Sequence, residues 1–151
     1  SSTGAVRLGG RGPTSSYQDT IDFATISTLG NYTDFGNLST AAADGSACSN
    51  STRGIYFSGY SGSYTNVIEY IQIATTGNAV DFGDQLANKA YGTAVSSPTR
   101  AVNMGGFDSP AATNVIEYVE IATTGNAVDF GDADSGTIQS AGGASNGHGG
   151  L

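Results

Sequence analysis

The sequence predicts an all-β protein assembled from three copies of one sheet-forming unit. The main observation is a near-duplication, because residues 65–84 read TNVIEYIQIATTGNAVDFGD and residues 113–132 read TNVIEYVEIATTGNAVDFGD. A more diverged copy, DTIDFATISTLGNYTDFGN, occupies residues 19–37. The second observation is compositional: 23 glycines and no window with a 3.6-residue apolar period favour short strands over helices. A period of about 48 residues is typical of repeat proteins, whose units bury their apolar faces against one another.

Two strands are predicted in the first half of each unit. The first is a short run of small residues, at 47–50, 94–97 and 143–146. The second is an apolar run that ends in a pair of small residues, at 3–10, 52–59 and 99–106. Its last residue is glycine in every unit (Gly10, Gly59 and Gly106), as expected at a crowded inner position where a larger side chain would collide.

Two further strands follow in the second half of the unit. Residues 66–74 have apolar side chains on both faces, which predicts a third strand that is covered on both sides. Gly77 and Asn78 form a typical two-residue hairpin signal, which we expect to turn the chain into a fourth strand at residues 79–82. The aromatic residue of this fourth strand is expected to be structural in each unit: Phe35, Phe82 and Phe130.

The unit boundaries overlap at the two chain ends. Residues 1–151 are predicted to be a single repeat domain, with units at about 1–49, 50–96 and 97–145. Residues 146–151 overlap the start of a further unit, so that Leu151 aligns with Ile55. The chain therefore enters its first unit at the second strand, and it ends with the first strand of a unit that it does not complete.

Four antiparallel strands in a unit of about 48 residues, with both sheet faces buried, are typical of a β-propeller blade. Propellers have about four to eight blades, so three four-stranded blades would leave open sheet edges. Strand exchange with a second copy would close the ring, and we expect this homodimer. A piece of a longer single-chain propeller and a trimeric fibre tip stay open as alternatives.

Composition and charge argue against several classes of partner. A net charge of −8 is the opposite of what a nucleic-acid-binding protein needs, so nucleic acid is not an expected partner. No apolar stretch approaches the roughly 20 residues of a membrane span, so no membrane insertion is expected. Cys48 is the single cysteine, and it aligns with Val95 and Ala144, which indicates a small buried residue.

The order of these motifs resembles the kelch repeat, with Tyr70 and Tyr118 at its tyrosine and the three fourth-strand phenylalanines at its tryptophan. The motif N-V-I-E-Y followed by A-T-T-G-N-A-V-D-F-G-D, together with the terminal SNGHGGL, is similar to repeats of structural proteins of marine tailed bacteriophages, especially cyanophages. This likeness covers essentially the whole chain. It implies an extracellular virion component, such as a tail-fibre or decoration protein, whose partners are other virion proteins and its own copies.

No catalytic residue, cofactor or metal site is predicted. Motifs of serine and metal-dependent hydrolases do not occur, and Trp, which sialidase-type propellers require, is absent from the sequence. Two acidic residues recur at equal spacing in every unit, one in the third strand and one in the fourth, whereas a catalytic site is normally built once from unlike residues. We therefore assign structural roles to Asp81 and Asp129, which accept turn hydrogen bonds or pair with Arg53 and Arg100.

The segment between the second and third strands varies while its flanks repeat. It contributes four aromatic residues, Tyr17, Tyr60, Tyr64 and Phe107. In a propeller such segments emerge on one face, where tyrosines among small polar residues offer contact area at low entropy cost. The sequence therefore predicts a non-enzymatic structural or adhesive protein that contacts host-surface glycans through this face. The alternative is a free lectin-like or protein-binding module.

Overall fold

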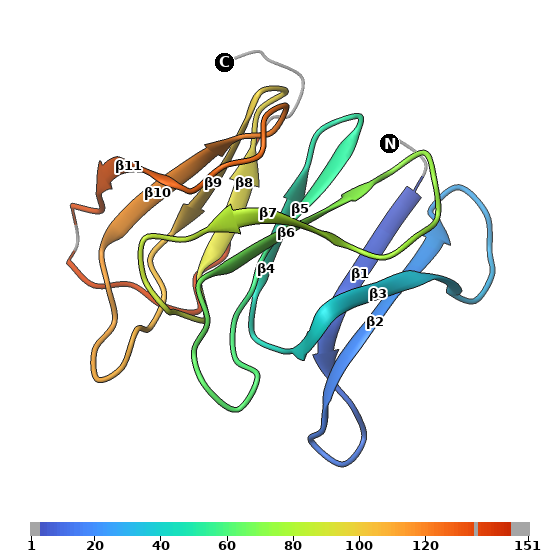
Figure 1. Ribbon diagram of the computed structural model, residues 1–151, viewed down its shortest axis with the longest axis horizontal. Helices are drawn as coiled ribbons and strands as arrows, with labels where there is room; N and C mark the ends of the chain where they lie inside the picture. The colour runs from blue at the N-terminus through green and yellow to red at the C-terminus, as the bar shows by residue number, and fades with distance from the viewer. Residues whose placement is uncertain (1–3, 135, 146–151) are drawn as a thin grey trace.

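The computed structural model describes residues 4–134 and 136–145, which form eleven strands and no helix (Figure 1). The all-β prediction is confirmed. The strands are β1 (Gly4–Arg11), β2 (Tyr17–Thr25), β3 (Thr33–Ala42), β4 (Ser46–Ser49), β5 (Arg53–Phe57), β6 (Val67–Gln72), β7 (Val80–Asp84), β8 (Thr93–Ser96), β9 (Arg100–Met104), β10 (Val115–Glu120) and β11 (Val128–Asp132).

The strands form three antiparallel sheets in chain order. The first sheet has the order β1-β2-β3, the second β4-β5-β6-β7 and the third β8-β9-β10-β11. Every neighbouring pair is consecutive in the chain, so each sheet is a simple meander. The first sheet therefore contains the counterparts of only the second, third and fourth strands of a unit. Strands β4 and β8 lie next to each other where the second and third sheets meet (Figure 1).

A β-bulge occurs at the same place in all three sheets. In the second sheet, Ile68 pairs with Gly83 while the next residue, Glu69, pairs with Asp81, so Phe82 is the extra residue. The register shifts in the same way around Phe35 in the first sheet and Phe130 in the third. A bulge re-aims the side chain that it contains, and in the first two sheets the fourth-strand phenylalanine packs in the junction with the following sheet.

The hairpin prediction for Gly77 and Asn78 is wrong. The chain reverses earlier, at a turn in which the Thr75 amide donates to the Gln72 carbonyl oxygen at 3.2 Å. Gly77 instead donates its amide to the carbonyl oxygen of Phe35 in the preceding sheet, at 2.8 Å. A Gly-Asn pair predicts a backbone that turns easily. The pattern does not indicate which carbonyl group will accept a hydrogen bond from the glycine amide.

The core lies between sheets rather than within one. One buried cluster joins the first and second sheets and includes Ile21, Phe35, Leu38, Tyr56 and Ile71. The other joins the second and third sheets and includes Ile55, Phe57, Phe82, Val119 and Ile121. We call these contacts the first and second junctions. Because each unit buries its apolar surface on the next unit, the sheets are stabilised mainly by their neighbours.

Candidate functional site

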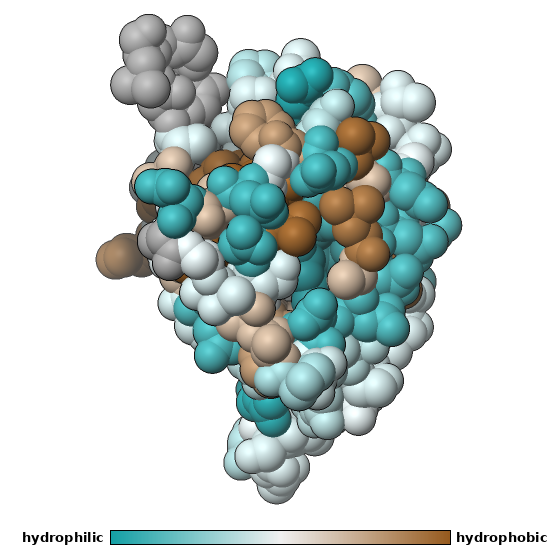
Figure 2. Space-filling view, turned by 90° about the vertical axis from the view of Figure 1, so that its left-hand side faces the viewer, coloured by the Kyte–Doolittle hydropathy of each residue, from teal (hydrophilic) through white to brown (hydrophobic). Residues whose placement is uncertain are grey.

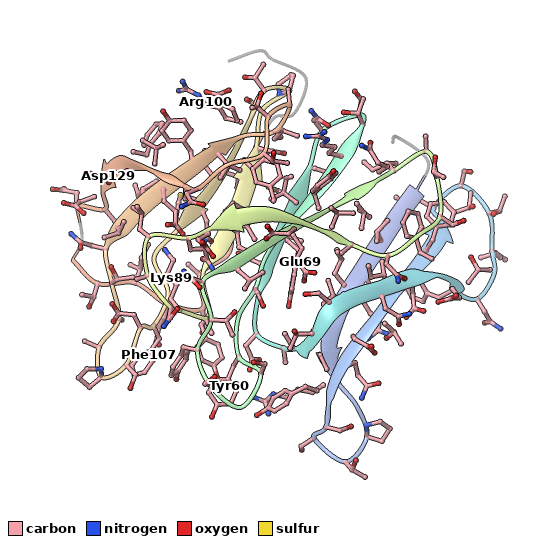
Figure 3. All side chains as sticks on the ribbon, viewed as in Figure 1. Tyr60, Glu69, Lys89, Arg100, Phe107 and Asp129 are labelled. Atoms are coloured by element: carbon pink, nitrogen blue, oxygen red, sulfur yellow. The ribbon has the colours of Figure 1, made fainter. Side chains whose placement is uncertain are left out.

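The four aromatic residues predicted from the variable segments form one continuous row. The ring centroids of Tyr17 and Tyr60 are 5.7 Å apart, those of Tyr60 and Tyr64 are 5.1 Å apart, and those of Tyr64 and Phe107 are 5.7 Å apart. All four side chains are half-buried. Figure 3 shows Tyr60 and Phe107 at the same end of the molecule. We call this set the aromatic row, and it draws residues from all three units.

Short backbone contacts hold the aromatic row in place. Tyr60 pairs in isolated β-bridges with Ala43 on one side and Tyr64 on the other. Phe107 pairs in the same way with Ala90 and Ala112. The rings are therefore positioned by main-chain hydrogen bonds at the sheet ends, which makes the row a preformed surface rather than a set of free loop side chains.

A charged pair lies beside the aromatic row. Arg11 donates to a carboxylate oxygen of Asp44 at 2.7 Å, and its guanidinium carbon is 5.3 Å from the centre of the Tyr17 ring. The hydrogen bond and the charge of Asp44 raise the pKa of Arg11. Burial raises the pKa of Tyr91, and the negative charge of Asp44 adds to this effect. Near neutral pH the surface therefore offers a cation, a carboxylate and a neutral phenol next to four rings.

The glycines that end the second strand of each unit lie behind this surface. A Cβ on Gly59 would overlap the backbone of Ala43 and Asp44, so the expected crowding is present there. At Gly10 the nearest atom to such a Cβ is 3.6 Å away, but φ is 115°, a backbone conformation that favours glycine. Gly106 combines both reasons, with φ 117° and the Ala90 carbonyl oxygen 2.8 Å from a Cβ.

The second junction contains a buried polar network. The Lys89 ammonium is 2.9 Å from Oε1 of Glu117, and these side chains are 2% and 0% exposed. The other carboxylate oxygen of Glu117 accepts a hydrogen bond from the Leu86 amide at 2.8 Å. Asn103 donates to both Gln85 and Glu117, at 2.9 and 3.2 Å. Each of these buried groups has a partner, so the network satisfies its own polar atoms within the junction.

The first junction places different side chains at the same positions. Tyr56 stands where Asn103 stands in the second junction, Leu38 where Gln85 stands, and Ala42 where Lys89 stands. Glu69 takes the place of Glu117 and accepts a hydrogen bond from the Ser39 amide at 2.9 Å. The carboxylate therefore serves the same purpose in both junctions, which is to bind an amide of the preceding sheet. Figure 3 shows Glu69 and Lys89 in the interior.

The predicted pairing of Arg53 and Arg100 with Asp81 and Asp129 is wrong. Arg53 lies over the Tyr70 ring, 4.5 Å from its centre, and donates to the carbonyl oxygen of Ile121 at 2.8 Å. Arg100 lies 4.4 Å from the centre of the Tyr118 ring. It donates to Glu120 at 2.7 Å, and this contact raises the pKa of Arg100. Each arginine lies over the tyrosine of the neighbouring strand because the face of the ring attracts the guanidinium and the alkyl stem packs on apolar surface.

The turn hydrogen bond that was the other expectation for the acidic residues is present at Asp129. Asp129 accepts a hydrogen bond from the Gly131 amide at 3.1 Å, as expected for a turn contact. Asp81 and Asp129 both lie on exposed parts of their strands. Figure 3 shows Asp129 at the outer edge of the third sheet.

The three fourth-strand phenylalanines do not share one environment. Phe35 and Phe82 are 5% and 2% exposed, whereas Phe130 is 57% exposed. The first two lie in the junctions, and Phe130 lies on the side of the third sheet that no described residue covers. Figure 2 views this side, where apolar side chains gather in the middle of a hydrophilic rim. The burial of each phenylalanine therefore depends on whether a following sheet covers it.

Three further predictions concern metal binding, membrane insertion and the end of the chain. Across residues 4–134 and 136–145, no group of three His, Cys, Asp or Glu side chains is arranged to hold a metal ion. No helix long and apolar enough to span a bilayer is found in the part of the chain that the structure covers. The alignment of Leu151 with Ile55 falls outside the described residues.

The comparisons with known proteins leave the family open, since no protein-family model and no curated protein sequence matches this chain.

Sequence reasoning missed the contacts between units. Asn78 accepts a hydrogen bond from the Asn37 amide at 3.0 Å, and Asn126 accepts one from the Asp84 amide at 3.1 Å. Repetition of Gly-Asn in all three units was the available signal. The pair predicts a turn, because a repeated pattern does not distinguish a contact within a unit from a contact between units.

Proposed function

We propose that the three sheets are consecutive blades of a β-propeller and that a second copy of the chain completes the ring. Three antiparallel meanders of one repeated sequence support this fold, as does their packing through equivalent contacts at both junctions. The first sheet has no counterpart of β4 or β8 among the described residues, which leaves a position for a strand from elsewhere.

The function that the geometry supports best is a non-enzymatic structural or adhesive component of a phage virion that binds host-surface glycans. The observation that carries this proposal is the aromatic row, since rings from three units meet on one end of the molecule. Rings of this kind offer their apolar faces to the C–H-rich face of a sugar. Arg11, Asp44 and the tyrosine hydroxyls offer hydrogen-bond partners to its hydroxyl groups.

The virion assignment rests on the sequence likeness to structural proteins of marine tailed phages. It places the protein outside the host cell, in contact with other virion proteins. Detection of the chain in purified particles tests this assignment, and its absence from all particles would favour the alternative of a free lectin-like or protein-binding module.

Binding to a glycan array tests the role of the aromatic row. The Tyr60→Ala/Tyr64→Ala double variant should lose binding by at least about 30-fold, because aromatic anchors carry much of the energy at such surfaces. The matched variant Val80→Ala removes an apolar side chain that is exposed away from the row, and it should bind as the wild type does. Unchanged binding by the double variant would exclude the row as the binding surface.

A further inference from the structure

The two outer sheets each have an uncovered side. We call the side of a sheet that packs on the following sheet its leading face, and the side that packs on the preceding sheet its trailing face. The leading face of the second sheet is buried at four apolar positions, whose equivalents in the third sheet are half-buried or exposed: Val102, Met104, Ile116 and Phe130. The trailing face of the first sheet is uncovered in the same way: Ile26 is 66% exposed, whereas its counterpart Ile121 is 0% exposed.

We infer that the leading face of the third sheet binds the trailing face of the first sheet of a second copy, and that residues 142–145 of each copy lie along β1 of the other. This inference rests on the blade arrangement proposed above and is independent of any ligand of the aromatic row. A second copy of the chain would thus cover both open faces.

The backbone contacts of the two internal junctions predict those of the third. Gly77 and Gly125 donate their amides to the carbonyl oxygens of Phe35 and Phe82, both at 2.8 Å. A Cβ on Gly36 or Gly83 would overlap the backbone of the incoming segment, so the close approach requires glycine at these two positions.

The corresponding groups are present at the two open faces. Gly131 has the same backbone conformation as Gly83, with φ 141° against 148°. No described atom lies within 4 Å of a Cβ placed on Gly131, whereas a Cβ on Gly83 would meet Gly125. Gly30 and Asn31 repeat the Gly77-Asn78 pair in the sequence. We therefore expect the Gly30 amide of one copy to donate to the Phe130 carbonyl oxygen of the other. Asn31 then accepts a hydrogen bond from the Asp132 amide, as Asn78 and Asn126 accept theirs.

Side-chain size is complementary at the position that differs most between junctions. Leu38 faces Tyr56 in the first junction, and Gln85 bonds to Asn103 in the second. The equivalent pair between copies is Ala133 and Arg7. A small residue on the third sheet thus leaves room for the long side chain of Arg7.

The end of the described chain follows the course of a first strand. Asp44 and Tyr91 precede β4 and β8 with φ 61° in both cases, and Ser140 has φ 54°. The Ser140 amide donates to the Tyr91 carbonyl oxygen at 2.7 Å, just as the Tyr91 amide donates to the Asp44 carbonyl oxygen at 2.7 Å. Gly143 then lies against β8, since a Cβ on it would be 2.8 Å from Oγ1 of Thr93. Residues 142–145 are exposed and run beside β8 as β8 runs beside β4.

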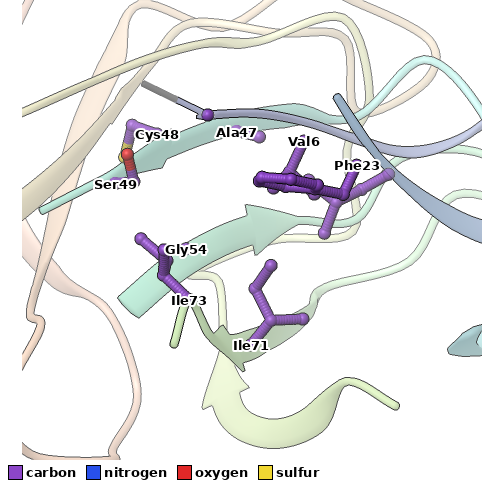
Figure 4. A pocket seen from close by; sticks show the side chains of 10 residues that line it. Val6, Phe23, Ala47, Cys48, Ser49, Gly54, Ile71 and Ile73 are labelled. Atoms are coloured by element: carbon purple, nitrogen blue, oxygen red, sulfur yellow. The ribbon is translucent and has the colours of Figure 1, made fainter. Parts of the chain in front are cut away.

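A cavity of about 200 Å³ marks the place where this segment is missing (Figure 4). It opens between the first two sheets, and its lining includes Val6, Phe23 and Ile71. The equivalent space in the second junction is filled by Cys48, which packs against the buried cluster there. Ala144 is the counterpart of Cys48, so residues 142–145 of a second copy would carry Ala144 into the cavity.

The molar mass of the assembly tests this inference, measured by sedimentation equilibrium on the full chain. One copy has a mass of 15.1 kDa, and the wild type should sediment as a pair of copies, at twice this value. Phe130→Asp places a charge in the new junction and should raise the dissociation constant at least about 30-fold. Val128→Asp is the matched control on the same strand. Its counterpart Val80 is 52% exposed although a following sheet covers the second sheet, so Val128, also 52% exposed, should stay outside the new junction.

A second variant tests the placement of the chain end. Ala144→Val gives this segment the residue that β8 has at the same position, and it should tighten the pair at least about fivefold by filling the cavity. A wild type that stays at 15.1 kDa would overturn the inference, and so would a pair that Phe130→Asp leaves intact. A three-copy particle would overturn it too, and no tightening by Ala144→Val would overturn the placement of residues 142–145. Circular dichroism shows whether each variant keeps the wild-type fold, and loss of glycan binding alone would leave the inference standing.

Discussion

The two internal junctions share their backbone contacts but not their side chains. In both, a Gly-Asn segment donates to the preceding sheet, and a buried glutamate accepts an amide from it. Tyr56 and Leu38 fill much of the interior of the first junction, whereas the interior of the second junction contains the Lys89–Glu117 ion pair. The comparison teaches that the backbone contacts define how one unit binds the next, while the side chains between them can change from apolar to charged.

The largest expected effect separates covered from uncovered phenylalanines. Phe82→Ala removes a ring from a packed junction and should lower the free energy of unfolding by about 3–5 kcal/mol. Phe130→Ala should change the unfolding of the single chain by no more than about 0.5 kcal/mol, because the ring is exposed. Urea unfolding of dilute protein measures both values, and equal losses would contradict the division into covered and open faces.

The charged interior of the second junction makes it sensitive to loss of one partner. Lys89→Met leaves the Glu117 carboxylate buried without its cation, which should cost about 3–5 kcal/mol of unfolding free energy. Adding Glu117→Gln removes the buried charge and still accepts the Leu86 amide, so the double variant should regain most of the loss. If the double variant is no more stable than Lys89→Met, the ion pair is not what distinguishes this junction.

The glycine contacts should show the same contrast between covered and open faces on a smaller scale. Gly83→Ala and Gly131→Ala impose a similar backbone strain, about 1–3 kcal/mol, since φ is 148° and 141°. Only at Gly83 does the new Cβ also meet the backbone of the next sheet. Thermal unfolding should therefore show a loss for Gly83→Ala that exceeds that for Gly131→Ala by at least about 1 kcal/mol. Identical losses would mean that the contact across the junction is loose.

The last effect is absent at neutral pH and develops only in alkaline solution. Burial raises the pKa of the Cys48 thiol in the second junction from 9.0 to about 12. Burial also raises the pKa of Tyr56 in the first junction above 10.0, with a further contribution from the charge of Glu69. A raised acid pKa means that the unfolded chain loses its proton first, so stability is complete below pH 9 and falls as the pH rises toward 12.

Urea midpoints between pH 7 and 11 measure this decline. Cys48→Val should remove the part that begins near pH 9, and Tyr56→Phe should remove the part that begins near pH 10. A decline that neither substitution alters would show that other groups set the alkaline limit.

Much of the architecture was predictable because it depends on local pattern. Short apolar runs and the repeat period predicted the meandering strands, and the variable segments predicted that Tyr17, Tyr60, Tyr64 and Phe107 gather at one end. These conclusions need only the direction in which a strand runs and the position at which it ends.

The remaining features depend on contacts between units, which local pattern does not encode. Gly77 and Asn78 have the composition of a turn, but they bind the preceding sheet. Arg53 was expected to pair with an acidic residue of the fourth strand, but it lies over an aromatic ring. Lys89 has alanine and isoleucine as its counterparts, so no repeat signal indicated the buried ion pair.

Hydrogen exchange at three equivalent amides tests most directly whether the open faces join. Asn37 and Asp84 donate their amides to asparagine side chains across the internal junctions. Asp132 should be protected to a similar degree when the protein is concentrated, and should lose this protection on dilution or in Phe130→Asp. Fast exchange at Asp132 at every concentration, beside slow exchange at Asn37 and Asp84, would show that the third junction does not form.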